Sequence, residues 1–182
     1  MTILPKINFM NLLPLFLTSL MLFSCGDDKA KPSAETTVEA ATSPSATEIA
    51  KRAEIVAYAK EYLGTAYCYA SSDPKKGFDC SGFVNFVYKN FGIVLPRSST
   101  GFENVGKKVK PEDFQVGDIL VFYGYQDSGN IGHVGIICEA NGMKSKFIHS
   151  SSGKEMAVII SELGSAGYTK RYYKCVDVLS GT

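Results

Sequence analysis

Tryptophan is absent from the 182-residue chain, and histidine occurs only twice. The 19 Lys and Arg residues nearly balance the 18 Asp and Glu residues, so the formal net charge is +1. So small a charge provides no electrostatic basis for binding nucleic acid, and no such partner is expected. The sequence also lacks a His-Glu-x-x-His zinc motif, internal repeats and a heptad pattern. It does have 10 Tyr and 11 Phe residues, which supply large apolar side chains for one domain with its own core.

Residues 1–24 are typical of a secretory signal peptide and are not expected to belong to the fold. One positive charge, Lys6, precedes an apolar run from Phe9 to Phe23. A membrane-spanning helix needs about 20 predominantly apolar residues, and polar residues interrupt this shorter run. We therefore expect the segment to be cleaved, with an uncleaved anchor helix as the alternative.

A lipid anchor is indicated at Cys25. The stretch Leu22-Phe23-Ser24-Cys25 resembles the bacterial lipobox, in which the cysteine is acylated and becomes the mature N-terminus. Phe23 departs from that pattern, because a smaller residue is usual at its position. Several acyl chains on one cysteine satisfy the rule that stable anchoring needs more than one lipid chain. We therefore expect an exported lipoprotein, held to a membrane by its lipid on the periplasmic or cell-surface side.

Residues 25–47 are expected to form a flexible tether that begins at the lipidated cysteine. The segment is rich in Ala, Ser, Thr, Pro, Glu and Lys and contains no aromatic residue, so it cannot form a core. As a flexible coil, a segment of this length spans about 25 Å on average. The folded domain is expected over residues 48–182.

A helix is predicted to open the folded domain. Ser45 and Glu48 fit a capping box, in which the serine caps the first turn and the glutamate reaches back toward it, and Thr47 is an alternative N-cap. The spacing of apolar residues predicts one inward face, with the Lys, Arg and Glu side chains outward and the helix ending at Gly64. The residues expected on the inward face are Ile49, Val56, Ala59 and Leu63.

Cys80 is predicted to lie at the N-terminus of a second helix, which ends at Gly92. The apolar residues that recur at helical spacing after it are Val84, Val87, Tyr88 and Phe91. The unpaired N–H groups and the positive dipole end of a helix favour an anion there. We therefore expect Cys80 to be a thiolate and a nucleophile. The alternative for any single cysteine is a small, buried hydrophobic residue.

The C-terminal half has the pattern of strands. Apolar runs of strand length alternate with turn signals such as Asn141-Gly142. The predicted strands cover residues 117–123, 133–138, 147–150, 156–160 and 172–178. Helices followed by a meander of strands predict an α+β fold with an antiparallel sheet.

His133 and His149 each lie at an end of an apolar strand segment. Taken alone, a histidine in such a place is more often a structural residue. Together with Cys80 they form the set that nucleophilic catalysis requires: one imidazole takes the thiol proton and the second orients the first. On adjacent strands, a register that carries both rings to one sheet face lets one imidazole bond the other. All three side chains are also competent zinc ligands, so a zinc hydrolase is the alternative, disfavoured by the missing zinc motif.

Four motifs, in this order, resemble the NlpC/p60 family of peptidoglycan endopeptidases. They are Asp79-Cys80-Ser81-Gly82-Phe83, Gly117-Asp118-Ile119-Leu120-Val121-Phe122, His133-Val134-Gly135-Ile136 and the later His149. The resemblance extends over residues 49–178. It implies a circularly permuted papain-like fold, with N-terminal helices packed on an antiparallel sheet, and a Cys80–His133–His149 triad. It also implies hydrolysis of a peptidoglycan stem peptide through a thioester intermediate.

Further positions carry over from the same resemblance. Tyr67 matches the family tyrosine that helps to bind the oxyanion, which would make it a fourth catalytic residue. The residues expected to bind substrate are Tyr69, Asp79, Ser81, Arg97 and Ser99. Asp79 and Ser81 stand where the family contacts the free amino end of its substrate or the backbone nearby. Ala70-Ser71, in place of a usual Gly-Gly pair, and Ala66, in place of a frequent proline, are departures; the first concerns the shape of the groove wall.

The expected protein is a cysteine peptidase that needs no cofactor and no metal and acts as a monomer on peptidoglycan stem peptides or muropeptides. Its expected target is the γ-D-glutamyl–diamino acid bond. The alternatives are the D-Ala–diaminopimelate cross-link and a wall-binding module without catalysis. Among the other cysteines, Cys138 and Cys175 are expected in the core and Cys68 near the site, although export permits a disulfide.

Overall fold

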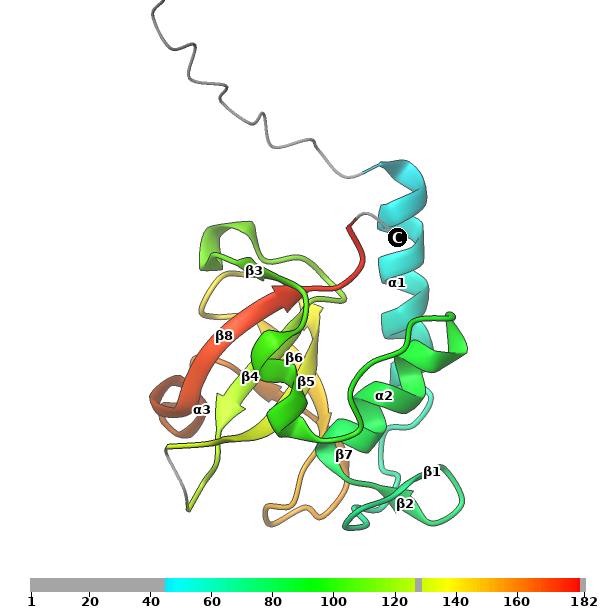
Figure 1. Ribbon diagram of the computed structural model, residues 1–182, viewed down its shortest axis with the longest axis vertical. Helices are drawn as coiled ribbons and strands as arrows, with labels where there is room; N and C mark the ends of the chain where they lie inside the picture. Colours follow the sequence, from blue (N-terminus) through cyan, green and yellow to red (C-terminus); the bar gives the residue numbers. More distant parts are fainter. Residues whose placement is uncertain (1–44, 127–128, 181–182) are drawn as a thin grey trace, which may run out of the picture. The chain divides into compact units, whose positions relative to one another are not determined.

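A six-stranded antiparallel sheet with helices against it is the framework of the part of the chain that the structure, a computed structural model, describes: residues 45–126 and 129–180 (Figure 1). The strands of this sheet are β3 (Lys107–Val109), β4 (Ile119–Tyr123), β5 (Ile131–Glu139), β6 (Lys146–Ser150), β7 (Val158–Glu162) and β8 (Tyr172–Asp177). The helices are α1 (Ala46–Lys60), α2 (Cys80–Asn90) and α3 (Ala166–Arg171), with 3₁₀ turns η1 (Ser99–Asn104) and η2 (Pro111–Asp113). A short ribbon pairs β1 (Ser72–Asp73) with β2 (Gly77–Phe78). The predicted α+β class, with helices packed on an antiparallel sheet, is confirmed.

The strand order of the sheet is β3-β8-β4-β5-β6-β7. The predicted meander therefore holds only from β4 to β7, because β8 returns to pair with β4 and β3 on the other edge. Lys107 and Lys108 are exposed and form most of edge strand β3. Lysines on an edge strand discourage pairing with a further chain.

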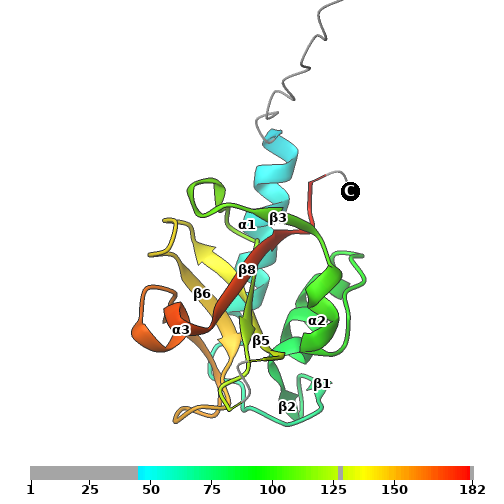
Figure 2. The same ribbon diagram turned by 60° about the vertical axis from the view of Figure 1, so that its left-hand side comes forward.

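The sheet separates two groups of buried side chains. The larger group lies between the sheet and the helices α1 and α2, and the smaller one lies on the opposite face, with Tyr168 of α3 packed against it. Figure 2 shows α2 and α3 on opposite sides of the sheet. The smaller group is aromatic and contains Phe114, Phe122 and Phe147, with partly buried Tyr168 and Tyr172 beside them.

Helix α1 has the predicted Ser45 cap, whereas the Glu48 carboxylate bonds Arg52 and Ser180 and does not reach back to Ser45, and the buried face of the helix is not the predicted one. The Ser45 side chain accepts a hydrogen bond from the backbone N–H of Glu48. Of the four expected inward residues, Val56 and Ala59 are buried, whereas Ile49 and Leu63 are 55% and 45% exposed. The regular helix ends at Lys60, and turns carry the chain on to Gly64.

Arg52 is one of the buried residues of α1, at 3% exposure, although the charged side chains of this helix were expected to point outward. The face that α1 turns toward the core is therefore shifted from the predicted one. The guanidinium lies 2.8 Å from the carboxylate of Asp118 and 2.7 Å from that of Asp177. These two carboxylates, from β4's start and β8's end, compensate the buried charge. Only the arrangement of the sheet reveals that partners for Arg52 exist.

Helix α2 follows the sequence pattern closely. Asp79 is its N-cap and accepts a hydrogen bond from the backbone N–H of Gly82 at 2.7 Å, so Cys80 is the first helical residue. Val84, Val87 and Tyr88 are fully buried, and Phe91 is partly buried. Gly92 follows the helix with φ +76°, the left-handed conformation that a glycine adopts freely at a helix end.

The signal peptide expected over residues 1–24, the lipidated Cys25 and most of the expected tether lie outside the described residues. Within residues 45–126 and 129–180, none of the helices combines the length and the apolar character that crossing a bilayer requires.

Candidate active site

Cys80 lies against the start of β5. Its thiol donates to the carbonyl oxygen of Gly132 over 3.9 Å, and the backbone N–H of Val134 also faces the sulfur. These two residues flank His133 in the chain, so the sulfur lies beside the segment that carries this histidine. The side chain is partly exposed and lines an open cleft.

The surroundings of Cys80 in the free protein favour the thiol over the expected thiolate. Burial raises the pKa of its thiol, and the neighbouring carboxylate of Asp79 raises it further. The backbone N–H groups of Ser81 and Val134 lower the pKa but do not outweigh burial. The helix N-terminus thus supplies the expected donors, yet loss of water around the sulfur is the larger effect. The resting side chain is therefore a neutral thiol at neutral pH.

The two histidines meet on one face of the sheet, as the sequence analysis anticipated. The β5–β6 ladder pairs Ile136 with Ile148, and next to this pair a Cβ atom at Gly135 would lie 3.0 Å from the Cβ atom of His149. His133 is two residues before Gly135, on the same face of β5. The Nε2 atom of His133 and the Nδ1 atom of His149 are 2.9 Å apart. The rings are perpendicular, with centroids separated by 4.8 Å.

Gly135 makes room for this contact. A Cβ atom at that position would lie 2.5 Å from the ring of Phe147 and 3.0 Å from the Cβ atom of His149. Real Cβ contacts are essentially never as short as the first of these. Phe147 in turn stacks on the imidazole of His149, with ring centroids 4.7 Å apart. The glycine of the His-Val-Gly-Ile motif thus has a steric role in seating the second histidine.

His149 is fully buried and keeps a neutral ring. Its Nε2 atom lies 2.9 Å from the hydroxyl of Ser161 and 3.3 Å from that of Tyr168. Burial lowers the pKa of His149 to about 3, and the cation of Arg171 contributes to that lowering. Burial, His149 and Arg171 together lower the pKa of His133 well below its ordinary value. Both imidazoles are therefore neutral at neutral pH in the free protein.

The first cleft, with a volume of about 390 Å³, brings together all the predicted substrate-binding residues and Tyr67 around Cys80. Its lining includes Tyr67, Tyr69, Asp79, Ser81, Arg97 and Ser99. Burial raises the pKa of Tyr67, and the nearby Cys80 and Asp79 raise it further, so this hydroxyl remains a donor. Tyr69 is 85% exposed at the rim.

The guanidinium of Arg97 forms a bidentate ion pair with the carboxylate of Asp79. The Nη1–Oδ1 and Nη2–Oδ2 distances are 2.9 Å and 2.7 Å. Oδ1 also accepts from the Ser81 hydroxyl and from the backbone N–H of Gly82. Oδ1 is thus fully occupied, whereas Oδ2 retains capacity for a further donor from the cleft.

A second cleft, of about 830 Å³, is lined by His133. Both clefts share Gly132, so they meet at the segment that faces the Cys80 sulfur. Ser161 of β7, Tyr168 and Arg171 were not identified from the sequence as site residues. No motif or spacing marks them, because only the register of β7 and the placement of α3 bring them to the histidines.

The other described cysteines form no disulfide. Cys138 and Cys175 are buried in the core, as expected, and Cys68 is partly exposed with its thiol 3.9 Å from the carbonyl oxygen of Tyr69. Across the described ranges, no three His, Cys, Asp or Glu side chains are grouped as metal ligands. The zinc alternative required Cys80, His133 and His149 to bind one ion. In the structure, Nε2 of His133 and Nδ1 of His149 are within hydrogen-bond distance of each other.

The NlpC/P60 family profile matches residues 64–177, which include the N-cap of α2, the nucleophile candidate and both histidines. The chain belongs to the NlpC/P60 family.

Two curated relatives and one solved structure illustrate the match to this family. The gamma-D-glutamyl-L-lysine dipeptidyl-peptidase of Bacillus cereus is 34% identical over 119 residues, 65% of this chain and 34% of the relative. The murein DD-endopeptidase MepS/murein LD-carboxypeptidase of Escherichia coli K12 is 36% identical over 122 residues, 66% of this chain and 59% of the relative. The crystal structure of an NlpC/P60 family protein from Bacillus cereus has a TM-score of 0.60 and 31% identity, covering 76% of this chain and 41% of that one. The matched region is thus a part of these longer proteins, and the neighbouring structure confirms the papain-like family fold.

Proposed function

We propose that this NlpC/P60 protein is a cysteine endopeptidase that hydrolyses stem peptides of bacterial peptidoglycan. The observation that carries the proposal is the His133–His149 contact of 2.9 Å beside Cys80, at the meeting point of two open clefts. A nucleophile, a base and a group that orients the base are the parts that covalent acyl transfer needs. The names of the relatives, which include a γ-D-glutamyl-L-lysine peptidase and a murein endopeptidase, support the substrate class.

Proton transfer accompanies the attack, because both partners start neutral. As the sulfur of Cys80 attacks the peptide carbonyl, its proton passes to Nδ1 of His133, the ring nitrogen not engaged with His149. Nε2–H of His133 then donates to Nδ1 of His149, and Nε2–H of His149 donates to the Ser161 hydroxyl. The imidazolium of His133 next protonates the leaving amine, and the neutral ring later activates water to hydrolyse the thioester.

His149 acts in this scheme as a neutral hydrogen-bond acceptor. Its pKa of about 3 keeps Nδ1 unprotonated when His133 becomes charged. A protonated His149 would present a second donor and a second positive charge to His133, and would block the relay. Its role is positioning, since it fixes which nitrogen of His133 faces the sulfur.

The oxyanion formed by the attack is held by the backbone N–H of Cys80 and the hydroxyl of Tyr67. The first donor belongs to the N-terminal turn of α2, and the second lines the same cleft as the sulfur. Removing one such donor typically raises the barrier by about 2.7–4 kcal/mol.

The bond we propose is the one between γ-D-glutamate and the diamino acid within one stem. The remaining acceptor capacity of Asp79, together with Ser81, suits a free amino end held a short distance before the scissile bond. Tyr69, Arg97 and Ser99 form the wall of that subsite. A second candidate is the D-Ala–diaminopimelate cross-link, which the relationship to a murein DD-endopeptidase favours.

We further propose that the protein reaches its substrate as an exported, monomeric lipoprotein. The signal peptide of residues 1–24, acylated Cys25 and a tether to residue 47 would place the domain of residues 48–182 beside the wall on the periplasmic or cell-surface side. A Cys25→Ala variant should lose membrane association while its soluble domain keeps full activity. Equal membrane recovery of the variant and the wild type would argue against the anchor.

Mass spectrometry of defined muropeptides after incubation with the protein tests the proposed activity and identifies the bond. We expect cleavage by the wild type and a loss on the order of 10³-fold or more in Cys80→Ala and His133→Ala, with unchanged circular dichroism. Release of a disaccharide-dipeptide indicates the γ-D-glutamyl bond, whereas conversion of cross-linked dimers to monomers indicates the alternative. Full activity in a folded Cys80→Ala variant would refute the mechanism, and binding to wall sacs without any product would indicate a non-catalytic module.

A further inference from the structure

Among the described residues that line the second cleft, Arg171 is the one charged side chain at neutral pH. The lining also includes His133, which is neutral, and five side chains that carry a hydroxyl group: Tyr125, Ser151, Ser152, Ser165 and Tyr168. A cleft that combines several hydroxyl groups with a single guanidinium is suited to an anionic ligand group. The first cleft differs, since its arginine is already paired with Asp79.

The three described arginines differ in their partners. Arg52 contacts Asp118 and Asp177, and Arg97 forms a two-armed pair with Asp79. Within residues 45–126 and 129–180, no carboxylate lies within ion-pairing distance of Arg171. Its own hydrogen bonds go to main-chain carbonyl oxygens, those of Gly167 and Tyr123, both at 3.2 Å.

Aromatic rings hold the guanidinium of Arg171 in place. Its central carbon lies 5.1 Å from the ring centroid of Tyr168 and 5.7 Å from that of Tyr125. A guanidinium supported by tyrosine rings and main-chain acceptors has little freedom left to lose when a ligand binds. Its positive charge also reaches the histidines, because Arg171 contributes to the lowered pKa values of His133 and His149.

The direction of the substrate follows from the proposed function, on which this inference rests. If the amino end lies at Asp79 in the first cleft, the scissile carbonyl lies at Cys80 and the leaving residue enters the second cleft. We propose that Arg171 binds a carboxylate of that leaving residue and makes the enzyme selective for leaving residues that carry one there. The bidentate geometry of a guanidinium matches a carboxylate, and a lysine ammonium at the same place would be repelled.

Two carboxylates of a stem peptide could be the one that Arg171 binds. One is the side-chain carboxylate of diaminopimelate, which lysine lacks and which amidation neutralises. The other is the main-chain carboxylate of a leaving residue that ends the peptide. Four synthetic peptides distinguish them: diaminopimelate with both carboxylates free, the same residue amidated on the side chain, the same residue amidated at the C-terminus, and lysine.

The test compares kcat/KM for these four peptides between the full mature wild type and Arg171→Gln. We expect the wild type to prefer the fully free peptide over one of the amidated forms by about 10- to 100-fold, and Arg171→Gln to reduce this ratio to near one. The amidated form that loses activity identifies the source of the carboxylate. A wild type without such a preference, or a preference that survives in Arg171→Gln, would overturn the inference.

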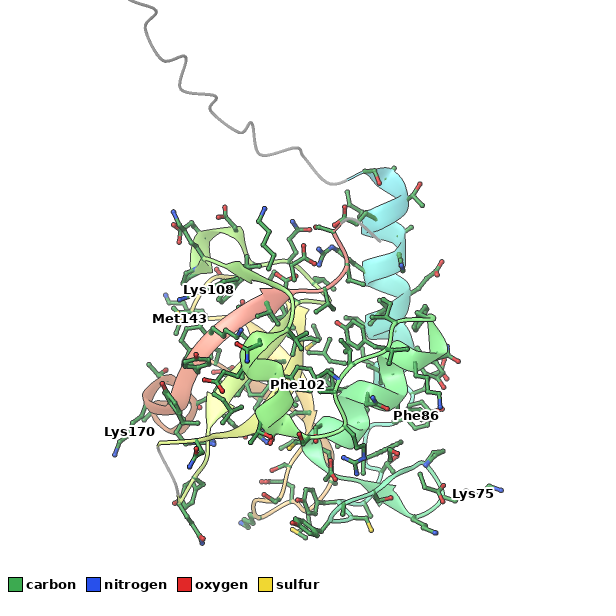
Figure 3. All side chains as sticks on the ribbon, in the orientation of Figure 1. Lys75, Phe86, Phe102, Lys108, Met143 and Lys170 are labelled. Atoms are coloured by element: carbon green, nitrogen blue, oxygen red, sulfur yellow. The ribbon has the colours of Figure 1, made fainter. Side chains whose placement is uncertain are left out.

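Lys170→Gln is the matched control, because it removes the same charge from the neighbouring residue outside the cleft. Figure 3 shows Lys170 at the outer side of α3, pointing away from the sheet. This variant should retain the wild-type preference. Arg171→Lys keeps the positive charge but not the bidentate geometry of a guanidinium, and it should retain only part of the wild-type preference. Thermal unfolding of all variants checks that loss of the hydrogen bond to Tyr123 has not loosened the site.

Binding to a Cys80→Ala variant separates this inference from the proposed function. Calorimetry with the same peptides measures the carboxylate contact without any turnover. If no peptide is cleaved by the wild type but the Cys80→Ala variant still prefers a free carboxylate in an Arg171-dependent way, the activity proposal fails and the binding inference stands. If peptides are cleaved and Arg171→Gln binds and cleaves every peptide as the wild type does, the inference fails and the activity proposal stands.

Discussion

His133 and His149 contact each other through Nε2 and Nδ1, 2.9 Å apart, although they are diagonal and not direct partners in the β5–β6 ladder. Gly135 lies next to His149, and its missing side chain leaves space for the ring of Phe147. The second histidine is buried and neutral, so in the proposed triad it takes the position that a carboxylate occupies in other triads, without adding a negative charge.

Replacing His149 should impair catalysis more than substrate binding. His149→Ala removes the acceptor that fixes the His133 tautomer, so we expect kcat to fall on the order of 10²-fold with little change in KM. His149→Asn, whose amide oxygen can accept the same bond, should recover part of that loss. Steady-state kinetics on a defined muropeptide checks both.

Ser161→Ala serves as the control for His149. It removes only the contact beyond the second imidazole, and Tyr168 remains 3.3 Å from the same nitrogen. Its kcat should fall less than that of His149→Ala. A rise in KM without loss of kcat in His149→Ala would contradict a positioning role.

The buried histidine should make the protein less stable in acid. The pKa of His149 is about 3 in the folded state against 6.5 for the ordinary residue, so the unfolded state binds more protons between these values. Stability is therefore fully present above pH 6.5 and is lost as the pH falls toward 3, by up to ~1.4 kcal/mol per pH unit for one such group.

Urea unfolding at pH 7, 6, 5 and 4 measures this dependence, and the difference between the wild type and His149→Asn isolates the histidine. The comparison is needed because Asp118 acts in the opposite direction: burial raises its pKa to about 6, so it favours the folded state as the pH falls. His149→Asn should show the shallower acid destabilisation. Parallel curves for the two proteins would mean that His149 titrates normally in the folded state.

Substitutions at Asp79 and Arg97 should change the reactivity of Cys80 in opposite directions. The carboxylate of Asp79 raises the pKa of the thiol, and Asp79→Asn removes that charge while retaining an oxygen that can cap α2. We expect iodoacetamide to alkylate Cys80 about 3- to 10-fold faster at neutral pH in this variant. Arg97→Met leaves the carboxylate without its cation and should slow the reaction.

Cys68 is the other partly exposed cysteine among the described residues, so these measurements are best made with Cys68→Ser as the common background. Muropeptide cleavage by both variants is expected to decline through KM, because each removes part of the proposed amine subsite. Equal alkylation rates in Asp79→Asn and Arg97→Met would refute the electrostatic account.

Gly135→Ala tests the steric account of the histidine pair. The added Cβ atom would meet Phe147 at 2.5 Å and force the ring or the strand to move, at a cost of about 1–3 kcal/mol in stability. Because Phe147 stacks on His149, we also expect a loss of activity. Gly167→Ala is the control, since a Cβ atom there meets nothing within 4 Å. Chemical denaturation should place the control within about 1 kcal/mol of the wild type, and similar values for both variants would remove the steric argument.

Local pattern was sufficient for the elements that carry the chemistry. The spacing of Val84, Val87 and Tyr88 identified α2 and the place of Cys80 at its start, because the 3.6-residue period depends only on which face is buried. Apolar runs likewise located β4, β5, β6 and β8, and the two histidines on neighbouring strands. The motifs around them were enough to predict the α+β, papain-like class.

What the sequence alone determined about this protein is therefore the set of candidate catalytic side chains and the elements that bear them. The tertiary structure decided the rest: the burial of Arg52, the return of β8 beside β4, and the arrival of Ser161 and Arg171 at the site. It also decided the protonation of Cys80, whose helix position favours a thiolate while its burial favours the thiol. The physical reason is that pairing, burial and electric fields depend on what packs against a residue, and these neighbours come from distant parts of the chain.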